Sequence, residues 1–292
     1  MPTRIAIGLI GGSGLYQMDG LTEMREFAIA TPFGPTSDPV VTGNLHGVPV
    51  AFLSRHGKGH RLLPGEVPYR ANIYALKTLG VRYLVAISAV GSLSEAIRPM
   101  DLVLPDQFID LTSRGETTFF GQGAVAHVSL AEPVCSALCD VIAQAVIDKK
   151  LADLRLHHGG TYVCIEGPAF STRAESHWYR SMNASIIGMT SMPEARLARE
   201  AEMAYAVLGL VTDYDCWHPC EAPVSCEMAR ANLEINAANA QLIVSAVARR
   251  LHASLPTSMT HTALSSALVT QPGQMSAETR KRLGVLIQRF TV

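Results

Sequence analysis

The segment Met189–Trp217, MTSMPEARLAREAEMAYAVLGLVTDYDCW, decides the fold that the rest of the chain completes. Its first third predicts a helix, because Pro193 suits a first helical turn and Thr190 or Ser191 can cap the unpaired amide groups. Residues 203–211 form an uncharged run, which is typical of a strand buried on both faces of a sheet. The segment therefore indicates a helix followed by a central strand.

Two acids, Asp213 and Asp215, follow this strand directly. In open α/β sheets, ligands bind at the carboxyl ends of the strands. If the strand continues through Tyr214, its alternation points both carboxylates to the same face. The pair therefore indicates either part of a ligand site or an ion-pair cluster with Arg196 and Arg199.

The composition limits the classes of function. The chain has 292 residues, of which 48% are hydrophobic and 17% charged, so we expect an oligomer with a substantial buried interface. A net charge of −1 offers no field that would attract nucleic acid or an acidic membrane. No apolar stretch reaches the length of a membrane span. We therefore expect small-molecule ligands.

Six dispersed cysteines and the absence of a signal-peptide pattern favour reduced thiols in a cytoplasmic protein. Cys216, His218 and Cys220 lie close in sequence, but their spacing matches no zinc pattern. We expect neither a metal nor a cofactor.

Small, polar or charged residues follow several other predicted strands. After the strand at residues 5–10 comes Gly11–Leu15, GGSGL, whose backbone amides and Ser13 hydroxyl could converge on an anion. A tight turn is the alternative. Gln17 stands where a dinucleotide-binding fingerprint needs its third glycine, which argues against an NAD enzyme.

The strand at residues 48–53 leads into Arg55 and His56, and the strand at 83–87 leads into Ser88 and Ala89. Arginine presents a planar fork that matches phosphate or carboxylate, although a solvated basic loop is the alternative. Together with the two acids, these strand ends predict one shared crevice with a cationic part and an acidic part.

Strands and helices alternate along the chain without a repeat period. This pattern predicts an α/β fold, a single domain at residues 1–253 with a central mixed β-sheet flanked by helices. Residues 254–292 are expected to hold a linker-like segment, rich in Ser, Thr and Ala up to residue 275, and a short C-terminal helix capped by Ser276.

Seven segments, in order between about residues 5 and 250, carry a recognisable pattern. They are GGSGL at 11–15, TPFG at 31–34, RHG at 55–57, QFID at 107–110, IEGP at 165–168, MT with PE at 189–194, and TDYDCW at 212–217. Together they resemble the methylthioadenosine phosphorylases, within the trimeric purine nucleoside phosphorylase family. The resemblance implies that inorganic phosphate attacks C1′ of methylthioadenosine, giving adenine and 5-methylthioribose 1-phosphate in purine and methionine salvage.

The resemblance also implies a homotrimer and a role for each matching residue. The implied phosphate ligands are Ser13, Arg55, His56, Ser88, Ala89 and Thr190. The implied nucleoside contacts are Met189 beneath the ribose, Phe170, Ser171, Asp213, Tyr214 and Asp215 at the base, Cys226 near the 5′ group, and His127 reaching the 5′ group from a neighbouring subunit.

The chemistry of the base supports a 6-aminopurine. Adenine shows an N7 acceptor beside an N6 donor, so one protonated and one ionised carboxyl match that edge. Two close acids titrate as a unit, and protonation of N7 as the glycosidic bond breaks is general acid catalysis. Relatives that use 6-oxopurines carry asparagine in place of Asp213 and glutamate in place of Ser171. A broader adenosine or methylthioinosine phosphorylase, a phosphate-independent nucleosidase and a non-catalytic nucleotide-binding module remain alternatives.

Overall fold

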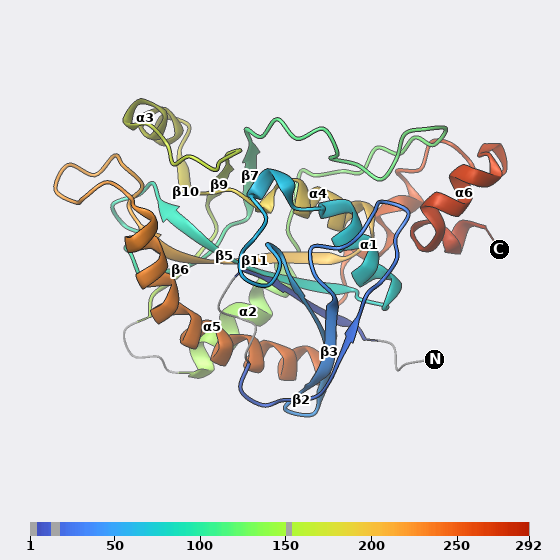
Figure 1. The fold of residues 1–292 in the computed structure, drawn as a ribbon, viewed down its shortest axis with the longest axis horizontal. Coiled ribbons are helices and arrows are strands. Elements are labelled where there is room, and N and C mark those ends of the chain that lie inside the picture. Colours follow the sequence, from blue (N-terminus) through green and yellow to red (C-terminus); the bar gives the residue numbers. More distant parts are fainter. Residues whose placement is uncertain (1–4, 13–17, 150–153, 292) are drawn as a thin grey trace.

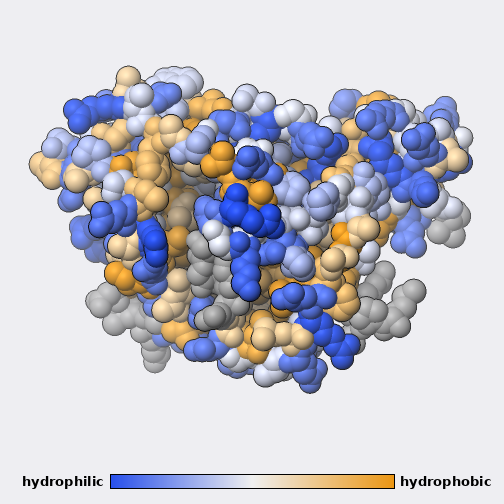
Figure 2. All heavy atoms as spheres, in the orientation of Figure 1, coloured by the Kyte–Doolittle hydropathy of each residue, from blue (hydrophilic) through white to orange (hydrophobic). Residues whose placement is uncertain are grey.

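The computed structural model describes residues 5–12, 18–149 and 154–291 (Figure 1). Within these residues, eleven strands form one mixed sheet, and helices cover both of its faces. This confirms the predicted fold class. Figure 2 shows hydrophilic and hydrophobic residues interspersed over the face seen in Figure 1.

Parallel strands form the centre of the sheet. They are β4 (Val48–Ser54), β1 (Ile7–Gly11), β5 (Tyr83–Ser92) and β11 (Ala204–Asp213), in that spatial order. Every residue of β11 is buried, as its uncharged sequence predicts. Gly11 lies opposite Ser54, and Ala89 opposite Leu210, so the carboxyl ends of these strands meet at one edge of the sheet.

The remaining strands extend this centre. They are β2 (Leu21–Phe27) and β3 (Val40–Leu45) beyond β4, then β10 (Ala184–Gly188), β9 (Thr161–Cys164) and β7 (Gln107–Asp110) beyond the end of β5, and β6 (Leu102–Leu104) and β8 (Leu156–His158) beyond β11. β5 is long enough to pair with three strands. Besides β1, its residues 83–91 pair with β11, and Gly91 and Ser92 pair with β10.

Helices pack on the two faces of the sheet. α1 (Tyr69–Thr78) and α4 (Ser191–Glu200) lie against one face, and α2 (Ser136–Lys149) and α5 (Cys226–Ala253) lie against the other (Figure 1). α3 (Arg173–Ser181) packs beside β10, and η1 (Pro64–Glu66) is a short 3₁₀ turn before α1. Among the helices that the structure describes, none is both long and apolar enough to cross a membrane.

The C-terminal segment begins where α5 ends, at Ala253. It contains η2 (Met259–Ser265), η3 (Pro272–Gln274), α6 (Ala277–Leu283), η4 (Gly284–Leu286) and η5 (Gln288–Phe290). Ser276 caps α6 as predicted, because its hydroxyl accepts a hydrogen bond from the Thr279 amide at 3.0 Å.

The linker-like composition of residues 254–275 does not produce an extended linker. Leu264, Ala267 and Met275 are buried in the same core as the sheet. Arg289, near the chain end, pairs with the buried Glu202. Small residues allow this segment to pack closely on the domain, whereas the domain boundary at 253 stays a prediction.

Candidate functional site

A cavity of about 890 Å³ opens at the edge where the parallel strands end. Its lining includes most of the predicted site residues, namely Arg55, His56, Ser88, Ala89, Phe170, Ser171, Met189, Thr190, Asp213, Asp215 and Cys226. Ser13 lies outside the described residues, although its neighbour Gly12 lines the cavity. The fold therefore brings the predicted cationic and acidic parts into one space.

Arg55 is held rigidly at one end of this cavity. Its Nε and Nη2 donate to the two carboxylate oxygens of Glu194 at 2.7 and 2.9 Å, and Nη1 donates to the Ile87 carbonyl at 3.0 Å. Tyr205 donates a further hydrogen bond to Glu194 at 3.0 Å. Burial alone would lower the pKa of Arg55, but the Glu194 carboxylate outweighs it and the pKa is raised. Arg55 is thus a fixed cation with two N–H groups left for a ligand.

Glu194 is the main site residue whose role the sequence did not reveal. It belongs to the PE pair in the resemblance, and its side chain is fully buried. The available signal was an acid in the first turn of a helix that packs on a buried strand, close to a predicted anion site.

His56 stands beside Arg55 in a neutral form. Its Nδ1 lies 2.9 Å from the Leu62 carbonyl oxygen, and its ring stacks on that of His60 with 4.3 Å between centroids. Burial and the neighbouring Arg55 charge lower the pKa of His56 to about 4. His60 also lines the cavity, and sequence reasoning did not single it out.

Two hydroxyl groups complete this end of the cavity. Ser88 Oγ, within β5, lies 3.3 Å from Thr190 Oγ1. Thr190 occupies the N-cap position of α4, but its side chain makes no capping bond, and Met192 interrupts the helix with extended backbone angles. The predicted cap is therefore wrong for Thr190, whose hydroxyl faces the cavity beside Ser88.

The acid pair lies further along the same strands, because Asp213 is opposite Gly91 whereas Ser88 is opposite Gly209. The Asp213 carboxylate accepts from the Asp215 amide at 2.8 Å and from the Thr212 hydroxyl at 2.6 Å. Asp215 has φ of 52°, so the strand does not continue through Tyr214. A side-chain turn at Asp213, rather than strand alternation, brings the two carboxyls together. This corrects the predicted reason for their common direction.

Burial raises the pKa of both Asp213 and Asp215, and for Asp213 the charge of Asp215 adds to the rise. The Asp215 carboxyl lies beside the hydroxyls of Ser171 and Ser176, which oppose the rise in its pKa, but Asp215 Oδ2 and Ser171 Oγ are buried without a well-formed hydrogen bond within the described residues. Buried polar atoms rarely remain unpaired in folded proteins, so these two atoms are suited to bind a polar ligand.

Two predicted contacts lie elsewhere in this chain. Tyr214 is absent from the cavity lining and instead packs against Trp217 and His218, at ring distances of 5.8 and 4.7 Å. The turn at Asp215 directs it away, so we do not retain it as a base contact. His127 is exposed on a loop, where its amide donates to the Ala267 carbonyl at 2.8 Å.

One face of α5 forms the outer wall of the cavity. Its lining residues recur at helical spacing and are Cys226, Ala229, Arg230, Leu233, Glu234, Ala237, Ala238 and Gln241. Half of these are Ala or Cys, and Arg230 pairs with Glu234 at 2.9 Å. This wall leaves room beside the acid pair for a ligand larger than a base alone.

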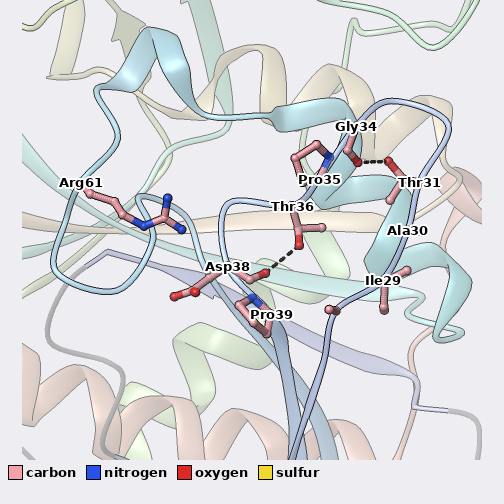
Figure 3. Close-up of a pocket in the computed structure, with 10 residues that line it drawn as sticks. Ile29, Ala30, Thr31, Gly34, Pro35, Thr36, Asp38, Pro39 and Arg61 are labelled. Carbon is pink, nitrogen blue, oxygen red and sulfur yellow. Dashed lines mark hydrogen bonds between the residues drawn. The ribbon is translucent and has the colours of Figure 1, made fainter.

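A smaller hollow of about 470 Å³ is lined by residues between 28 and 39 and by Arg61 (Figure 3). Ile29, Pro39 and Arg61 line it, and Arg61 donates to the Ser37 carbonyl at 2.6 Å. In the loop after β4, Arg55, His56 and His60 therefore line the large cavity, whereas Arg61 lines the small one.

The described residues contain no group of three or more His, Cys, Asp or Glu side chains that could hold a metal ion. Cys216 and His218, which lie close in sequence, each contact another group. Cys216 Sγ donates to the Ser171 carbonyl at 3.2 Å, and His218 lies 3.2 Å from Glu95.

Comparisons with known proteins agree with this geometry. Residues 6–249 match the model of the phosphorylase superfamily. The S-methyl-5′-thioadenosine phosphorylase of Thermosynechococcus vestitus is 55% identical over 284 residues, which cover 97% of this chain and 98% of that protein.

Solved structures are similar as well. A methylthioadenosine phosphorylase from an antarctic soil metagenomic library has a TM-score of 0.93 and 59% identity, and the match covers 97% of this chain and 99% of that one. The methylthioadenosine phosphorylase of Schistosoma mansoni in complex with adenine has a TM-score of 0.83 and 34% identity, with 91% and 99% covered. The chain therefore belongs to the phosphorylase superfamily and, within it, to the family of the S-methyl-5′-thioadenosine phosphorylases.

Proposed function

We propose that this protein catalyses the phosphorolysis of S-methyl-5′-thioadenosine to adenine and 5-methylthioribose 1-phosphate. The observation that carries the proposal is the single cavity with Arg55, His56 and two hydroxyls at one end and a buried acid pair at the other. An anion site facing two acids matches a reaction between phosphate and a nucleoside with a basic purine. The high identity to relatives named for this activity supports the same conclusion.

The end of the cavity lined by Arg55, His56, Ser88 and Thr190, which we call the anion end, would hold inorganic phosphate as a co-substrate. Arg55 supplies a fixed positive charge, and Ser88 and Thr190 supply hydroxyl donors beside it. The Ala89 backbone and the Ser13 hydroxyl are further proposed ligands. Phosphate held there attacks C1′ and stabilises the positive charge that develops on the ribose as the glycosidic bond breaks. We propose no cofactor for this reaction.

The acid end would hold the adenine edge. Because burial raises the pKa of both acids, the pair holds a proton at higher pH than two exposed carboxyls would. The protonated carboxyl donates to N7 and the ionised one accepts from N6. Donation to N7 makes adenine a better leaving group, and Phe170, Ser171 and Met189 line the space between base and ribose.

We further propose a cytoplasmic homotrimer in which His127 reaches the 5′ group of a neighbouring subunit's substrate. The exposure of His127 away from its own cavity supports this arrangement. All six cysteines are free, which suits a reducing compartment. Light scattering should give about three times the chain mass of 31.4 kDa. A monomeric mass would contradict the trimer but leave the reaction untouched.

The first experiment is to incubate the purified protein with methylthioadenosine, with and without phosphate, and to measure adenine. We expect adenine only when phosphate is present. Release without phosphate would make the protein a nucleosidase and leave Arg55 without a role. No release in either tube would contradict the proposal and favour a non-catalytic module. Parallel assays with adenosine and methylthioinosine define the substrate range.

A further inference from the structure

His56 is held in one tautomer. A carbonyl oxygen can only accept a hydrogen bond, so the 2.9 Å contact with Leu62 places a hydrogen on Nδ1. In a neutral ring, Nε2 then carries a lone pair and no hydrogen. His56 lines the cavity, and Nε2 has no hydrogen-bond partner within the described residues. His56 Nε2 is therefore a hydrogen-bond acceptor at the anion end.

The surroundings of His56 oppose a second proton. The residue is 6% exposed, the Arg55 cation lies beside it, and His60 is stacked on the ring. Arg114 adds further positive charge, and only the Leu62 carbonyl favours protonation. The pKa of about 4 follows from this balance, so the ring is neutral at physiological pH.

We infer that His56 makes the anion end selective for a tetrahedral oxyanion that carries a hydroxyl group, such as hydrogen phosphate, over one that carries none, such as sulfate. The inference rests on the proposed function, which places phosphate beside His56. The hydroxyl of hydrogen phosphate donates to Nε2, while its other oxygens accept from Arg55 and the neighbouring hydroxyls. Sulfate has the same charge and shape at neutral pH, but one of its oxygens would face the lone pair of Nε2.

This contact also orients the nucleophile. Hydrogen phosphate has one protonated oxygen and three that share the negative charge. With the hydroxyl fixed at His56, the oxygens that remain for C1′ are the charged ones, which are the better nucleophiles. His56 thus acts as a positioning group that takes no proton during the reaction.

The test compares anions with the unmodified protein. Adenine release from methylthioadenosine is measured at varied phosphate, with sulfate as a competitor and arsenate as a substitute for phosphate. We expect the sulfate inhibition constant to exceed the phosphate KM by about tenfold or more, since a mispaired buried polar group costs about ten- to a hundredfold. Arsenate keeps a hydroxyl and should support release.

Sulfate that competes as tightly as phosphate binds would overturn this inference while leaving the phosphate-dependent reaction in place. A lack of phosphate-dependent release would instead overturn the proposed function and this inference with it. The two failures are therefore distinguishable within one data set.

A variant isolates the histidine. His56→Gln offers both a donor and an acceptor, so the ratio of sulfate inhibition constant to phosphate KM should fall about tenfold. The control is His158→Gln, which changes a histidine on β8 whose side chain is 49% exposed. An unchanged ratio in folded His56→Gln protein would overturn the inference. If that variant does not fold, the comparison of sulfate with arsenate on the unmodified protein decides alone.

Discussion

Asp213 and Asp215 are both buried, but their carboxyl groups differ in their hydrogen bonds. Asp213 accepts well-formed hydrogen bonds from Thr212 and from the Asp215 amide, whereas the Asp215 carboxyl has only the looser neighbourhood of the Ser171 and Ser176 hydroxyls. Asp213→Asn removes a titratable group, so the pair can no longer hold one proton and one negative charge. We expect kcat/KM for methylthioadenosine to fall by about 10²–10⁴-fold, the usual range for a lost general acid or base.

The same variant should lose much less activity on methylthioinosine, because its O6 is an acceptor that an amide can bind. Steady-state assays on both nucleosides measure this, with the exposed Asp140→Asn on α2 as a control. Unchanged turnover of methylthioadenosine would remove Asp213 from the mechanism.

His56 also makes stability depend on pH. Its pKa is lowered from 6.5 to about 4 in the folded protein, so between these values the unfolded chain binds the proton and the folded chain does not. The stability is therefore fully present above pH 6.5 and is lost as pH falls towards 4, by roughly 2 kcal/mol at pH 5. The raised pKa values of Asp213, Asp215 and Glu200 act in the opposite direction.

Urea unfolding of the unmodified protein and of His56→Gln at pH 7.5 and pH 5 isolates the histidine, because the acids are common to both. We expect the variant to lose less stability on acidification. Equal losses would mean that His56 is readily protonated in the folded protein.

Site residues were predictable from the sequence where they directly follow or end a buried strand. Arg55 and Asp213 come at the ends of buried strands, so the parallel sheet brings them to one edge. The bond between Arg55 and Glu194 joins residues 139 positions apart, and no local pattern indicates it. The backbone turn at Asp215 was also missed, because its positive φ depends on a side-chain hydrogen bond.

Among the elements, the turn between β10 and α4 depends on an arginine from a distant loop. Arg114 donates to the carbonyls of Met189 and Met192, and to the Tyr69 hydroxyl at 2.9 Å. Its side chain is 6% exposed. This clamp holds Met189 and the neighbouring Thr190 at the cavity, although no local pattern around Arg114 indicates it.

Arg114→Ala should therefore loosen the turn. We expect a loss of roughly 3 kcal/mol in unfolding free energy, because buried carbonyls lose a charged donor. The KM values for phosphate and nucleoside should both rise, since the turn contributes to both. Thermal unfolding and steady-state kinetics measure these effects, with the exposed Arg173→Ala on α3 as a control. Normal KM values in a destabilised variant would show that the clamp is structural only.

Elements with strong patterns were predicted well. The buried run of β11, the strand β4 and the Ser276 cap of α6 all agree with the sequence. β2 was missed because none of its residues is buried, so it lacks an apolar alternation. β8 was missed because it spans only three residues.

For the whole molecule, the C-terminal segment is part of the architecture. Residues Ala126 and Leu268 form a bridge, and the His127 amide bonds to Ala267. Arg282 donates to the carbonyls of Phe119 and Gly121 at 2.8 and 2.7 Å. The segment thereby fixes the long loop that carries His127. Composition alone indicated a linker. The contacts that hold the segment join residues more than a hundred positions apart, so no local pattern indicates them.

This support gives His127 a testable role between subunits. It is exposed and lies outside the cavity of its own chain, so a contribution to catalysis requires a neighbour. His127→Ala should raise the KM for methylthioadenosine about tenfold, the loss of one good polar contact, with the phosphate KM nearly unchanged. Co-expression of His127→Ala with Asp213→Asn chains under separate tags then yields mixed assemblies.

In mixed assemblies, an Asp213→Asn chain keeps its own His127 and can supply it to the intact acid pair of a His127→Ala neighbour. Part of the active sites should therefore regain the KM of the unmodified protein, although neither parent does so alone. Purification through both tags, followed by kinetics at varied methylthioadenosine, measures this recovery. A KM that remains at the His127→Ala value would show that His127 does not act across subunits, because the mixed assemblies contain every residue that such sharing requires.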